Sequence, residues 1–479
     1  MVSDSSLPAA SPLSAHERTA IRMIPFIVGC ALFMQMLDAT AVATALPVMA
    51  QAMGTTPVKM NVTITSYLLA LAVFVPISGW AADRFGARRV FMTAIVMFTL
   101  SSIACALAQS LPQLIIARTL QGMAGAMMVP VGRIILLRRT PKTELLRAMT
   151  FLSMPALLGP ITGPPLGGFL VTYASWHWIF LINIPVGILG VALVRRYIPA
   201  DTPEKAPRLD WLGFLLSGVG LACLVSGFES IGHRDVSRLH VLTLVGVGLA
   251  CGLLYWRHAR THAHPIVDLS LLKVRSFAIA TLGGNLCRLT VGASPFLLAM
   301  MLQVAFGMSA FAAGLITFSS AVGALMMKLV ASPMINRFGF KRVLVVNAVL
   351  AGILVMVCGL FSAHTPVWVM IGVLVIGGIS RSLQFTAVNT LTYADLDSRD
   401  MSRASSFSAM MQQLAISLGV GGAALVLNLS MHWRGADELA PVDTFWGFMI
   451  LGVMACLSAF SFARLPGNVA QHLSAGKKP

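Results

Sequence analysis

The sequence predicts an all-α polytopic membrane protein with fourteen transmembrane helices, and three observations lead to that prediction. Of the 479 residues, 57% are hydrophobic and only 11% are charged, with a mean hydropathy of +0.83, far outside the range of soluble domains. Fourteen segments each hold the roughly 20 apolar residues that a helix needs to cross a bilayer. Loops rich in basic residues alternate with loops that are poor in them.

The predicted spans are separated by mostly short polar connections. A miscounted span would invert every later loop and blur the alternation of charge, so the charge pattern supports this number. The spans run approximately over residues 23–45, 61–81, 89–108, 113–136, 148–171, 178–197, 210–229, 239–258, 276–302, 312–333, 341–361, 366–390, 404–430 and 443–465.

Lys and Arg gather on one side of the membrane in this arrangement. Twenty-five of the 34 basic residues fall in the two tails and in the loops after even-numbered spans, whereas four fall on the other side. Cytoplasmic loops collect Lys and Arg, so we expect both termini to lie in the cytoplasm. The expected location of the protein is the bacterial inner membrane. The net charge of +17 does not indicate a nucleic-acid partner, because the basic residues are scattered between apolar runs.

An internal repeat divides the chain. Residues 83–89, DRFGARR, follow span 2, and residues 336–342, NRFGFKR, follow span 10 in the same register. The match requires spans 7 and 8 to be inserted between two six-helix halves, in a six plus two plus six arrangement. The predicted parts are a disordered cytoplasmic tail (1–22), an N-terminal bundle (23–197), two inserted helices with their flanking loops (198–275), a C-terminal bundle (276–466) and a cytoplasmic tail (467–479).

Asp38 is the only acid deep inside a predicted span. A carboxylate at the centre of a transmembrane helix carries an insertion penalty of about 2.5 to 3.5 kcal/mol, so it usually faces a cavity and has a function. Arg118 in span 4 cannot lose its proton, and we expect it to act as a fixed charge beside Asp38. The alternative is a structural cation that bonds backbone carbonyls.

Cations outnumber acids inside the predicted spans. Arg288, Lys328 and Arg381 join Arg118 there, and Arg133 lies nearer a helix end, where it could equally reach the membrane surface. Cations that face the cavity would favour an anionic substrate, whereas Lys328 and Arg381 reaching toward helix ends would not. The predicted substrate-cavity residues are Gln35, Arg288, Lys328, Arg381 and Gln384.

Two motifs in the first half resemble signatures of the major facilitator superfamily. The stretch GWAADRFGARR at 79–89 is similar to the loop that latches the two halves of that fold in the outward-facing state. The stretch LIIARTLQG at 114–122 is similar to a span-4 motif whose arginine, here Arg118, takes part in proton coupling. The resemblance assigns the latch to Gly79, Asp83, Arg84, Gly86, Arg88 and Arg89.

Span 5 carries GPITGPPLGG at 159–168, which resembles the antiporter motif of the exporters in this superfamily. The matching residues are Gly159, Gly163, Pro164, Gly167 and Gly168. The stretch LDATAVATALP at 37–47 resembles the first-span signature of the fourteen-helix drug:proton antiporter branch. Residues 175–187 follow the sixth-span pattern of that branch. Taken over residues 27–466, the resemblance is to the MdtD-type multidrug transporters.

This resemblance implies the major facilitator fold and proton-coupled efflux of small molecules by alternating access. The proton motive force would be the energy source, and we expect no cofactor, no metal and a monomer whose partners are the substrate, protons and the bilayer. We expect no enzyme activity, because the chain has no phosphate-binding glycine loop, zinc signature or nucleophile elbow. His258, His262 and His264 are predicted to lie in a solvated basic loop. A non-transporting sensor or scaffold is the alternative of another class.

Single cysteines introduced near Ser5 and near Gly476 are expected to resist labelling by a membrane-impermeant reagent in intact cells, because both termini are predicted to be cytoplasmic. A cysteine at His364, between spans 11 and 12, should be labelled under the same conditions. Labelling of either terminus in intact cells would contradict the predicted topology.

Overall fold

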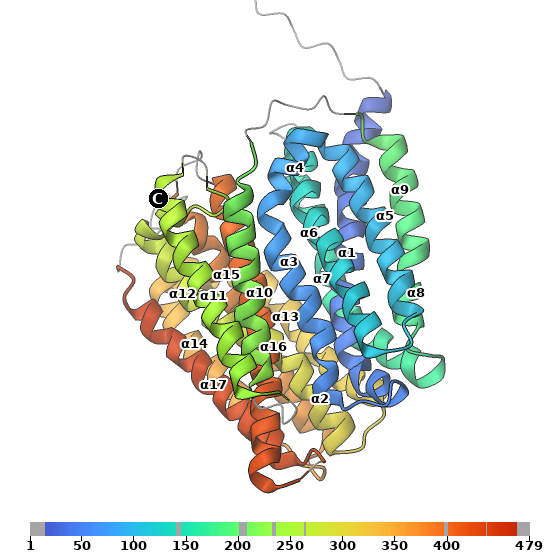
Figure 1. Ribbon diagram of the computed structural model, residues 1–479, viewed down its shortest axis with the longest axis vertical. Coiled ribbons are helices and arrows are strands. Elements are labelled where there is room, and N and C mark those ends of the chain that lie inside the picture. Colours follow the sequence, from blue (N-terminus) through green and yellow to red (C-terminus); the bar gives the residue numbers. More distant parts are fainter. Residues whose placement is uncertain are drawn as a thin grey trace, which may run out of the picture.

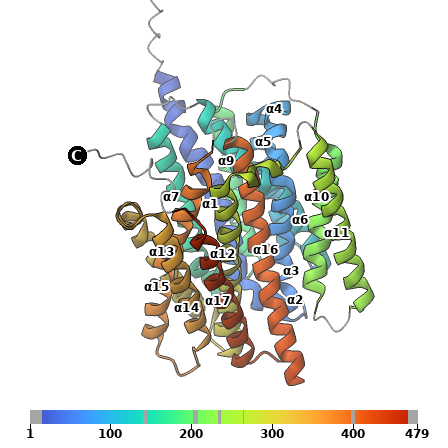
Figure 2. The ribbon, with the colours of Figure 1, turned by 90° about the vertical axis from the view of Figure 1, so that its left-hand side faces the viewer.

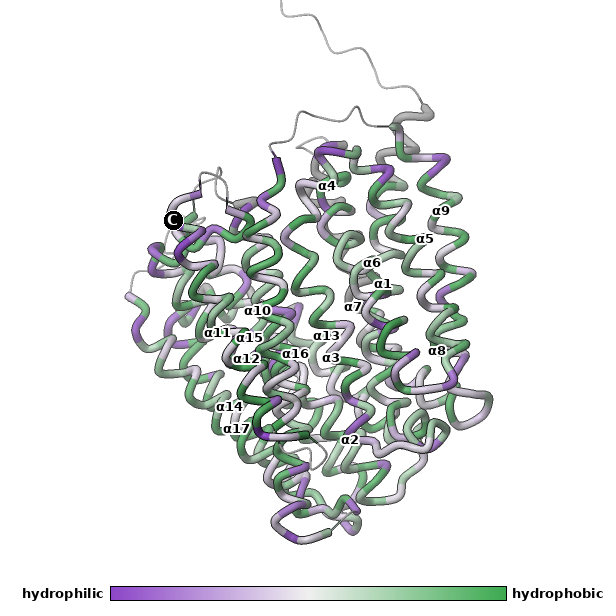
Figure 3. Tube along the Cα trace, viewed as in Figure 1, coloured by the Kyte–Doolittle hydropathy of each residue, from purple (hydrophilic) through white to green (hydrophobic). Residues whose placement is uncertain are grey.

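The computed structural model describes residues 15–139, 145–200, 208–231, 236–262, 265–396, 401–436 and 438–466. Every regular element in these residues is a helix, which confirms the all-α prediction. Thirteen helical segments are long and apolar enough to cross a membrane, and the 29-residue helix α7 (Leu145–Tyr173) takes the place of predicted span 5. The helices run side by side as one bundle (Figure 1), and hydrophilic residues concentrate toward its two ends (Figure 3).

The first six predicted spans correspond to consecutive helical segments, some of them interrupted. Span 2 is continuous across four short elements, and span 6 across two. The elements are α1 (Ala15–Ala52), α2 (Pro57–Met60), α3 (Val62–Phe74), η1 (Val75–Ile77), α4 (Ser78–Phe85), α5 (Ala87–Ala106), α6 (Leu111–Arg139), α7, α8 (Trp178–Leu181) and α9 (Asn183–Tyr197).

The remaining spans follow in the same way, with a π-helical turn, η3, at the end of span 9. The elements are α10 (Trp211–Ser230), α11 (Arg238–Thr261), η2 (Leu269–Lys273), α12 (Arg275–Ala299), η3 (Met300–Ala305), α13 (Ala310–Phe338), α14 (Phe340–Gly359), α15 (Val367–Ala394), α16 (Met401–Arg434) and α17 (Pro441–Ala463).

Helix α1 begins at Ala15, ahead of the predicted boundary at residue 22. The predicted disordered tail therefore needs correction over residues 15–22, where the sequence AHERTAIR extends the membrane helix by about two turns. Ala, Glu and Arg are good helix formers, which explains the extension. Residues 1–14 and the predicted tail 467–479 lie outside the described residues.

The same helix pairs recur in the two halves of the chain. In the first half, α1 packs on α7, α3 on α6, and α5 on α9; in the second half, α12 packs on α16, α13 on α15, and α14 on α17. These are the pairs of spans 1 and 5, 2 and 4, and 3 and 6 of each six-helix half. The spatial repeat matches the sequence repeat.

The repeated turn after the second helix of each half depends on a glycine. Gly86 ends α4 with φ +89°, and Gly339 ends α13 with φ +78°, a region that L side chains rarely adopt. Asp83 pairs with Arg138 of α6 at 2.7 Å, and Arg88 donates to the Arg195 carbonyl of α9 at 2.8 Å. The predicted latch residues Asp83 and Arg88 therefore bond within their own half, while Arg84 and Arg89 are exposed.

Helices α10 and α11 form a hairpin at the edge of the bundle (Figure 2). Helix α10 contacts α3 of the first half and α16 of the second. The rings of Phe74 and Phe214 lie 5.4 Å apart, and Phe228 lies beside Gly422. The inserted pair thus covers one of the two junctions between the halves.

The halves bond to each other at the end of the bundle opposite the N-terminus and the DRFGARR loop. Gln303 Nε2 donates to the Thr44 carbonyl at 2.7 Å, and the Phe311 backbone N–H donates to Thr172 Oγ1 at 3.2 Å. Phe311 also makes ring contacts with Phe169 and Tyr173. With this end joined and the latch bonded within its own half, the structure represents a state that is closed at the end opposite the basic loops.

The glycines of α7 bring three helices together. A Cβ at Gly159 would lie 2.6 Å from Met36 Cβ, and one at Gly167 would lie 2.9 Å from the Ala41 backbone, both on α1. Gly163 faces Thr40 of α1, and Gly168 faces the Ala310 carbonyl of α13. The small residues of the predicted antiporter motif therefore allow close packing against both halves.

Gly167→Ala is expected to destabilise the protein by about 1 to 3 kcal/mol, because its methyl group would meet the backbone of α1 rather than a movable side chain. Thermal unfolding of the purified protein measures the effect. Gly372→Ala is the matched control, since nothing lies within 4 Å of a Cβ at this helical position. Equal melting temperatures for the two variants would contradict the packing argument.

Candidate functional site

The candidate site centres on Asp38, which is 1% exposed and lies midway along α1. Its Oδ2 accepts a hydrogen bond from Arg118 Nη1 of α6 at 2.5 Å. Its Oδ1 accepts from Gln121 Nε2 and from Asn183 Nδ2, both at 3.1 Å. Three donors from two other helices therefore hold this carboxylate in place.

Arg118 is the cation of this site and is fully buried. Besides Asp38, it donates to Gln121 Oε1 at 2.6 Å and, through Nε, to the Thr63 carbonyl of α3 at 3.1 Å. Its guanidinium lies 4.3 Å from the centre of the Tyr67 ring, a cation–π contact. Arg118 thus bonds both a carboxylate and a backbone carbonyl, so the contacts expected for each of the two alternatives left open by the sequence are present.

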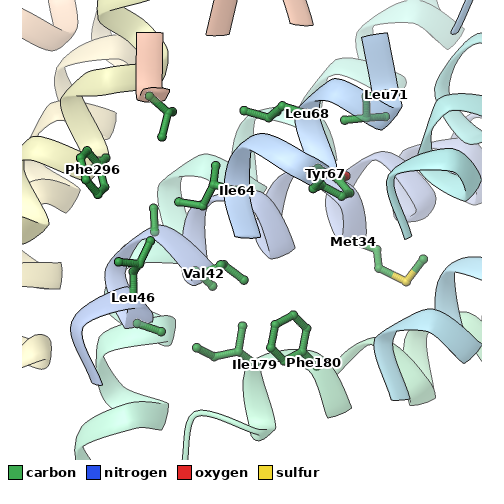
Figure 4. Close-up of a cluster of buried hydrophobic side chains, with 14 of the residues drawn as sticks. Met34, Val42, Leu46, Ile64, Tyr67, Leu68, Leu71, Ile179, Phe180 and Phe296 are labelled. Atoms are coloured by element: carbon green, nitrogen blue, oxygen red, sulfur yellow. The ribbon is translucent and has the colours of Figure 1, made fainter. Parts of the chain in front are cut away.

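The side-chain amides of Gln121 and Asn183 are held in turn by a serine of a further helix. Ser102 Oγ of α5 accepts from Gln121 Nε2 at 2.9 Å and from Asn183 Nδ2 at 2.8 Å. The network therefore ties together five helical elements of the first half: α1, α3, α5, α6 and α9. Figure 4 shows buried side chains of α1, α3 and α8 that belong to one core cluster of this half, including Val42, Leu46, Ile64, Tyr67, Ile179 and Phe180.

Sequence reasoning assigned no role to Gln121, Asn183 or Ser102. Gln121 carried a usable signal, because it stands three residues after Arg118 and so shares its helix face. Asn183 stood inside the motif at 175–187 without a partner to suggest its function. Nothing in the sequence distinguished Ser102 from the other small residues of its helix.

A cavity of about 400 Å³ lies between the two halves. Its walls come from α1, α3, α6 and α7 on one side and from α12, α13, α15 and α16 on the other. Arg118 forms part of the wall, whereas Asp38 lies behind it. Arg118 Nη2 has no hydrogen-bond partner among the described residues. The guanidinium therefore stands between the buried acid and the cavity.

The structure divides the predicted cavity residues between two spaces. Gln35, Lys328 and Arg381 line the central cavity, Lys328 with an exposed side chain. Arg288 and Gln384 line a smaller pocket of about 80 Å³ inside the second half, and Arg381 borders both. The expectation that Arg288 and Gln384 line the substrate cavity is therefore corrected, because both line the smaller pocket instead.

Two further buried acids have structural partners. Asp443 near the start of α17 accepts from Arg434, Ser430 and the Ala440 backbone. Asp210 caps α10 by accepting from the Gly213 backbone at 2.8 Å, and it pairs with His258 Nε2 at 2.7 Å. Burial raises the pKa of the Asp210 carboxyl, but these hydrogen bonds and the nearby imidazole outweigh it and hold the pKa below its usual value.

His258 thus bonds to the cap of α10 instead of lying in a solvated loop. Asp210, His258 and His262 bring ligand atoms within 4.8 Å of one another, the one such group among the described residues. The rings of His258 and His262 stack at 4.9 Å. Because Asp210 already accepts from a backbone N–H and from His258, the group is explained as a tie between α10 and α11. His264 lies outside the described residues.

The fold and the site together define a membrane transporter in which two six-helix halves enclose a central cavity. The family model of the Major Facilitator Superfamily matches residues 28–257 and 280–478. The chain belongs to the major facilitator superfamily. Its relatives and its structural neighbours are transporters, not enzymes.

The relatives are similar along nearly the whole chain. The chain is 40% identical over 458 residues to "Putative multidrug resistance protein MdtD" of Escherichia coli O157:H7, covering 95% of this chain and 96% of the relative. A relative of the same name in Shigella boydii has the same identity and coverage. The predicted resemblance to MdtD-type proteins is confirmed.

Solved structures show the same fold at low identity. A POT family transporter in complex with a thioalcohol-conjugated peptide superposes with a TM-score of 0.69 at 16% identity, covering 92% of this chain and 95% of that one. The human organic anion transporter MFSD10 gives a TM-score of 0.61 at 14% identity, covering 92% and 99%. These likenesses confirm the major facilitator fold.

Proposed function

We propose that this protein is a proton-coupled efflux transporter of the drug:H⁺ antiporter type, which exports small molecules across the bacterial inner membrane by alternating access. The observation that carries the proposal is the fully buried pair of Asp38 and Arg118, whose arginine forms part of the wall of the central cavity. The 40% identity to multidrug-resistance relatives supports the drug-export class.

Asp38 acts as the proton carrier in this proposal. Protonating it in the observed state would leave the buried charge of Arg118 without its counter-charge, a change that costs about 3 to 5 kcal/mol when one partner of a buried pair is lost. Proton uptake is therefore linked to a rearrangement that gives Arg118 another partner. Arg118, as a residue of the cavity wall, is where substrate would influence that exchange.

The observed state corresponds to the inward-facing step of the cycle, with the basic end in the cytoplasm. The joined end would then face the periplasm, and the contacts of Gln303 with Thr44 would be broken in the outward-facing state. In that state Asp83 would leave Arg138 and bond to a group of the second half. A proton that enters the cell down a membrane potential of about 100 mV contributes roughly 2.3 kcal/mol to export. The proton motive force is therefore the energy source in this proposal, and no cofactor is required.

An exporter of organic anions, such as carboxylates or metal chelates, is the second candidate. The described charged residues that line the central cavity are Arg118, Lys328 and Arg381, and no Asp or Glu among the described residues lines it. A cationic wall attracts an anionic group through charge-assisted hydrogen bonds and repels a lipophilic cation. In either case we propose that the protein acts as a monomer whose partners are the substrate, protons and the bilayer.

Asp38→Asn is expected to reduce proton-driven uptake into everted vesicles to the level of vesicles without the protein, because an amide cannot carry the proton. Ethidium and carboxyfluorescein serve as a cationic and an anionic probe. Asp395→Asn, an exposed acid at the end of α15, is the matched control and should keep normal uptake. Full proton-driven transport by Asp38→Asn would remove Asp38 from the mechanism.

Lys328→Gln is expected to weaken uptake of carboxyfluorescein about tenfold while leaving ethidium uptake unchanged, because the substitution removes one cation from the cavity wall. Arg133→Gln is the control, since Arg133 is an exposed cation of α6 outside the cavity lining. Normal export of ethidium by the native protein, with no transport of carboxyfluorescein, would favour cationic drugs over anions.

A further inference from the structure

The second half contains a side pocket that the proposed transport mechanism does not use. This side pocket has a volume of about 80 Å³, on a scale where one water needs roughly 10 to 15 Å³. It therefore has room for a small ion with a few waters, but it is far below the roughly 300 to 1,000 Å³ typical of sites for drug-sized ligands. It shares a wall with the central cavity at Ser294, Ser320, Arg381 and Phe385.

Two arginines line the side pocket. Arg288 of α12 is 4% exposed; its Nη2 donates to Asn389 Oδ1 at 2.8 Å and its Nη1 to Asn285 Oδ1 at 3.4 Å. Arg381 of α15 donates through Nη2 to Ser320 Oγ at 2.7 Å. These acceptors are all neutral, and no Asp or Glu among the described residues lines the side pocket.

The contrast with the first half is one of charge balance. There, the buried Arg118 has the carboxylate of Asp38 as its counter-charge. Arg288 and Arg381 have amides and a hydroxyl, which accept hydrogen bonds but supply no negative charge. An arginine cannot become neutral by losing its proton, and a buried ion without a counter-charge costs several kcal/mol. Both arginines line the same small pocket.

Donor groups remain for a ligand. Each guanidinium has five N–H groups, and the bonds above occupy two on Arg288 and one on Arg381. No nitrogen of the two guanidiniums is both fully buried and without a hydrogen-bond partner. The remaining N–H groups therefore have space to face the pocket. Donors with a net charge of two and no acid define an anion-binding environment.

We propose that the side pocket binds a small anionic group at its two arginines, Arg288 and Arg381. Chloride from solution fits its volume, and so does the carboxylate of a transported molecule that reaches in through the shared wall. The shared chemistry is one compact negative charge held by guanidinium N–H groups. The proposal does not depend on proton coupling, and it requires no transport to be tested.

The test is the thermal stability of the purified protein in detergent, measured against increasing chloride at constant ionic strength. A bulky sulfonate, MES, replaces chloride in the reference series because it is too large for the side pocket. The melting temperature is expected to rise with chloride and to saturate. Line broadening of the ³⁵Cl NMR signal by the native protein measures binding directly, so the test does not rely on any variant being stable.

Arg288→Gln and Arg381→Gln each remove one charge and keep a polar side chain of similar reach. Each is expected to weaken chloride binding about tenfold or more. Lys328→Gln is the control, because Lys328 is a cation of the central cavity that does not line the side pocket. It should leave the chloride response unchanged. If either arginine variant fails to fold, the NMR measurement on the native protein still decides the outcome.

An acetate series distinguishes the two sources of the anionic group. Stabilisation by chloride supports an inorganic occupant, and stabilisation by acetate alone supports the carboxylate of a transported molecule. Two results would overturn the proposal: native protein that responds to neither anion in the melting and NMR measurements, or a chloride response that both arginine variants retain in full. Loss of proton coupling on Asp38→Asn with an intact chloride response would separate this site from the transport mechanism.

Discussion

The ion pair of Asp38 and Arg118 is the interaction on which the first half of the molecule depends. Each partner alone would be a costly charge in an apolar bundle, and together they still need the amides of Gln121 and Asn183 to complete their hydrogen bonds. Ser102 in turn orients both amides. A single titratable group is thus connected to five helical elements, so a change in its charge affects their packing together.

The second half has the same helix pairing but a different polar interior. Asn347, Ser380 and Gln384 form a neutral network there, with Asn347 Nδ2 donating to Gln384 Oε1 and to the Ser380 carbonyl, both at 2.8 Å. No acid among the described residues takes part in it. The repeat has therefore kept the backbone arrangement while the two interiors diverged, one around a titratable pair and the other around fixed cations and amides.

The sequence was sufficient to predict the helical fold, the fourteen spans and the six plus two plus six order, because bilayer thickness and loop charge constrain them strongly. It also singled out Asp38 and Arg118, since charges are rare inside spans. It could not place Arg288, because which face of a helix meets a cavity depends on helix rotation and on neighbours far away in the chain. Ser102 and Asn183 were missed for a related reason: neutral polar residues carry little cost in a span until their partners are known.

The α10 and α11 hairpin covers only one of the two junctions between the halves, so the two flanks of the transporter that face the lipid differ in thickness. Helix α10 lies across the junction of α3 and α16, whereas the junction of α7 and α13 is closed by those two helices themselves, through small residues and the rings of Phe169, Tyr173 and Phe311. A lipophilic molecule that diffuses within the bilayer meets an added layer of protein on one flank and a single helix pair on the other. Toward the bilayer, the α7 and α13 flank is therefore the thinner barrier around the central cavity.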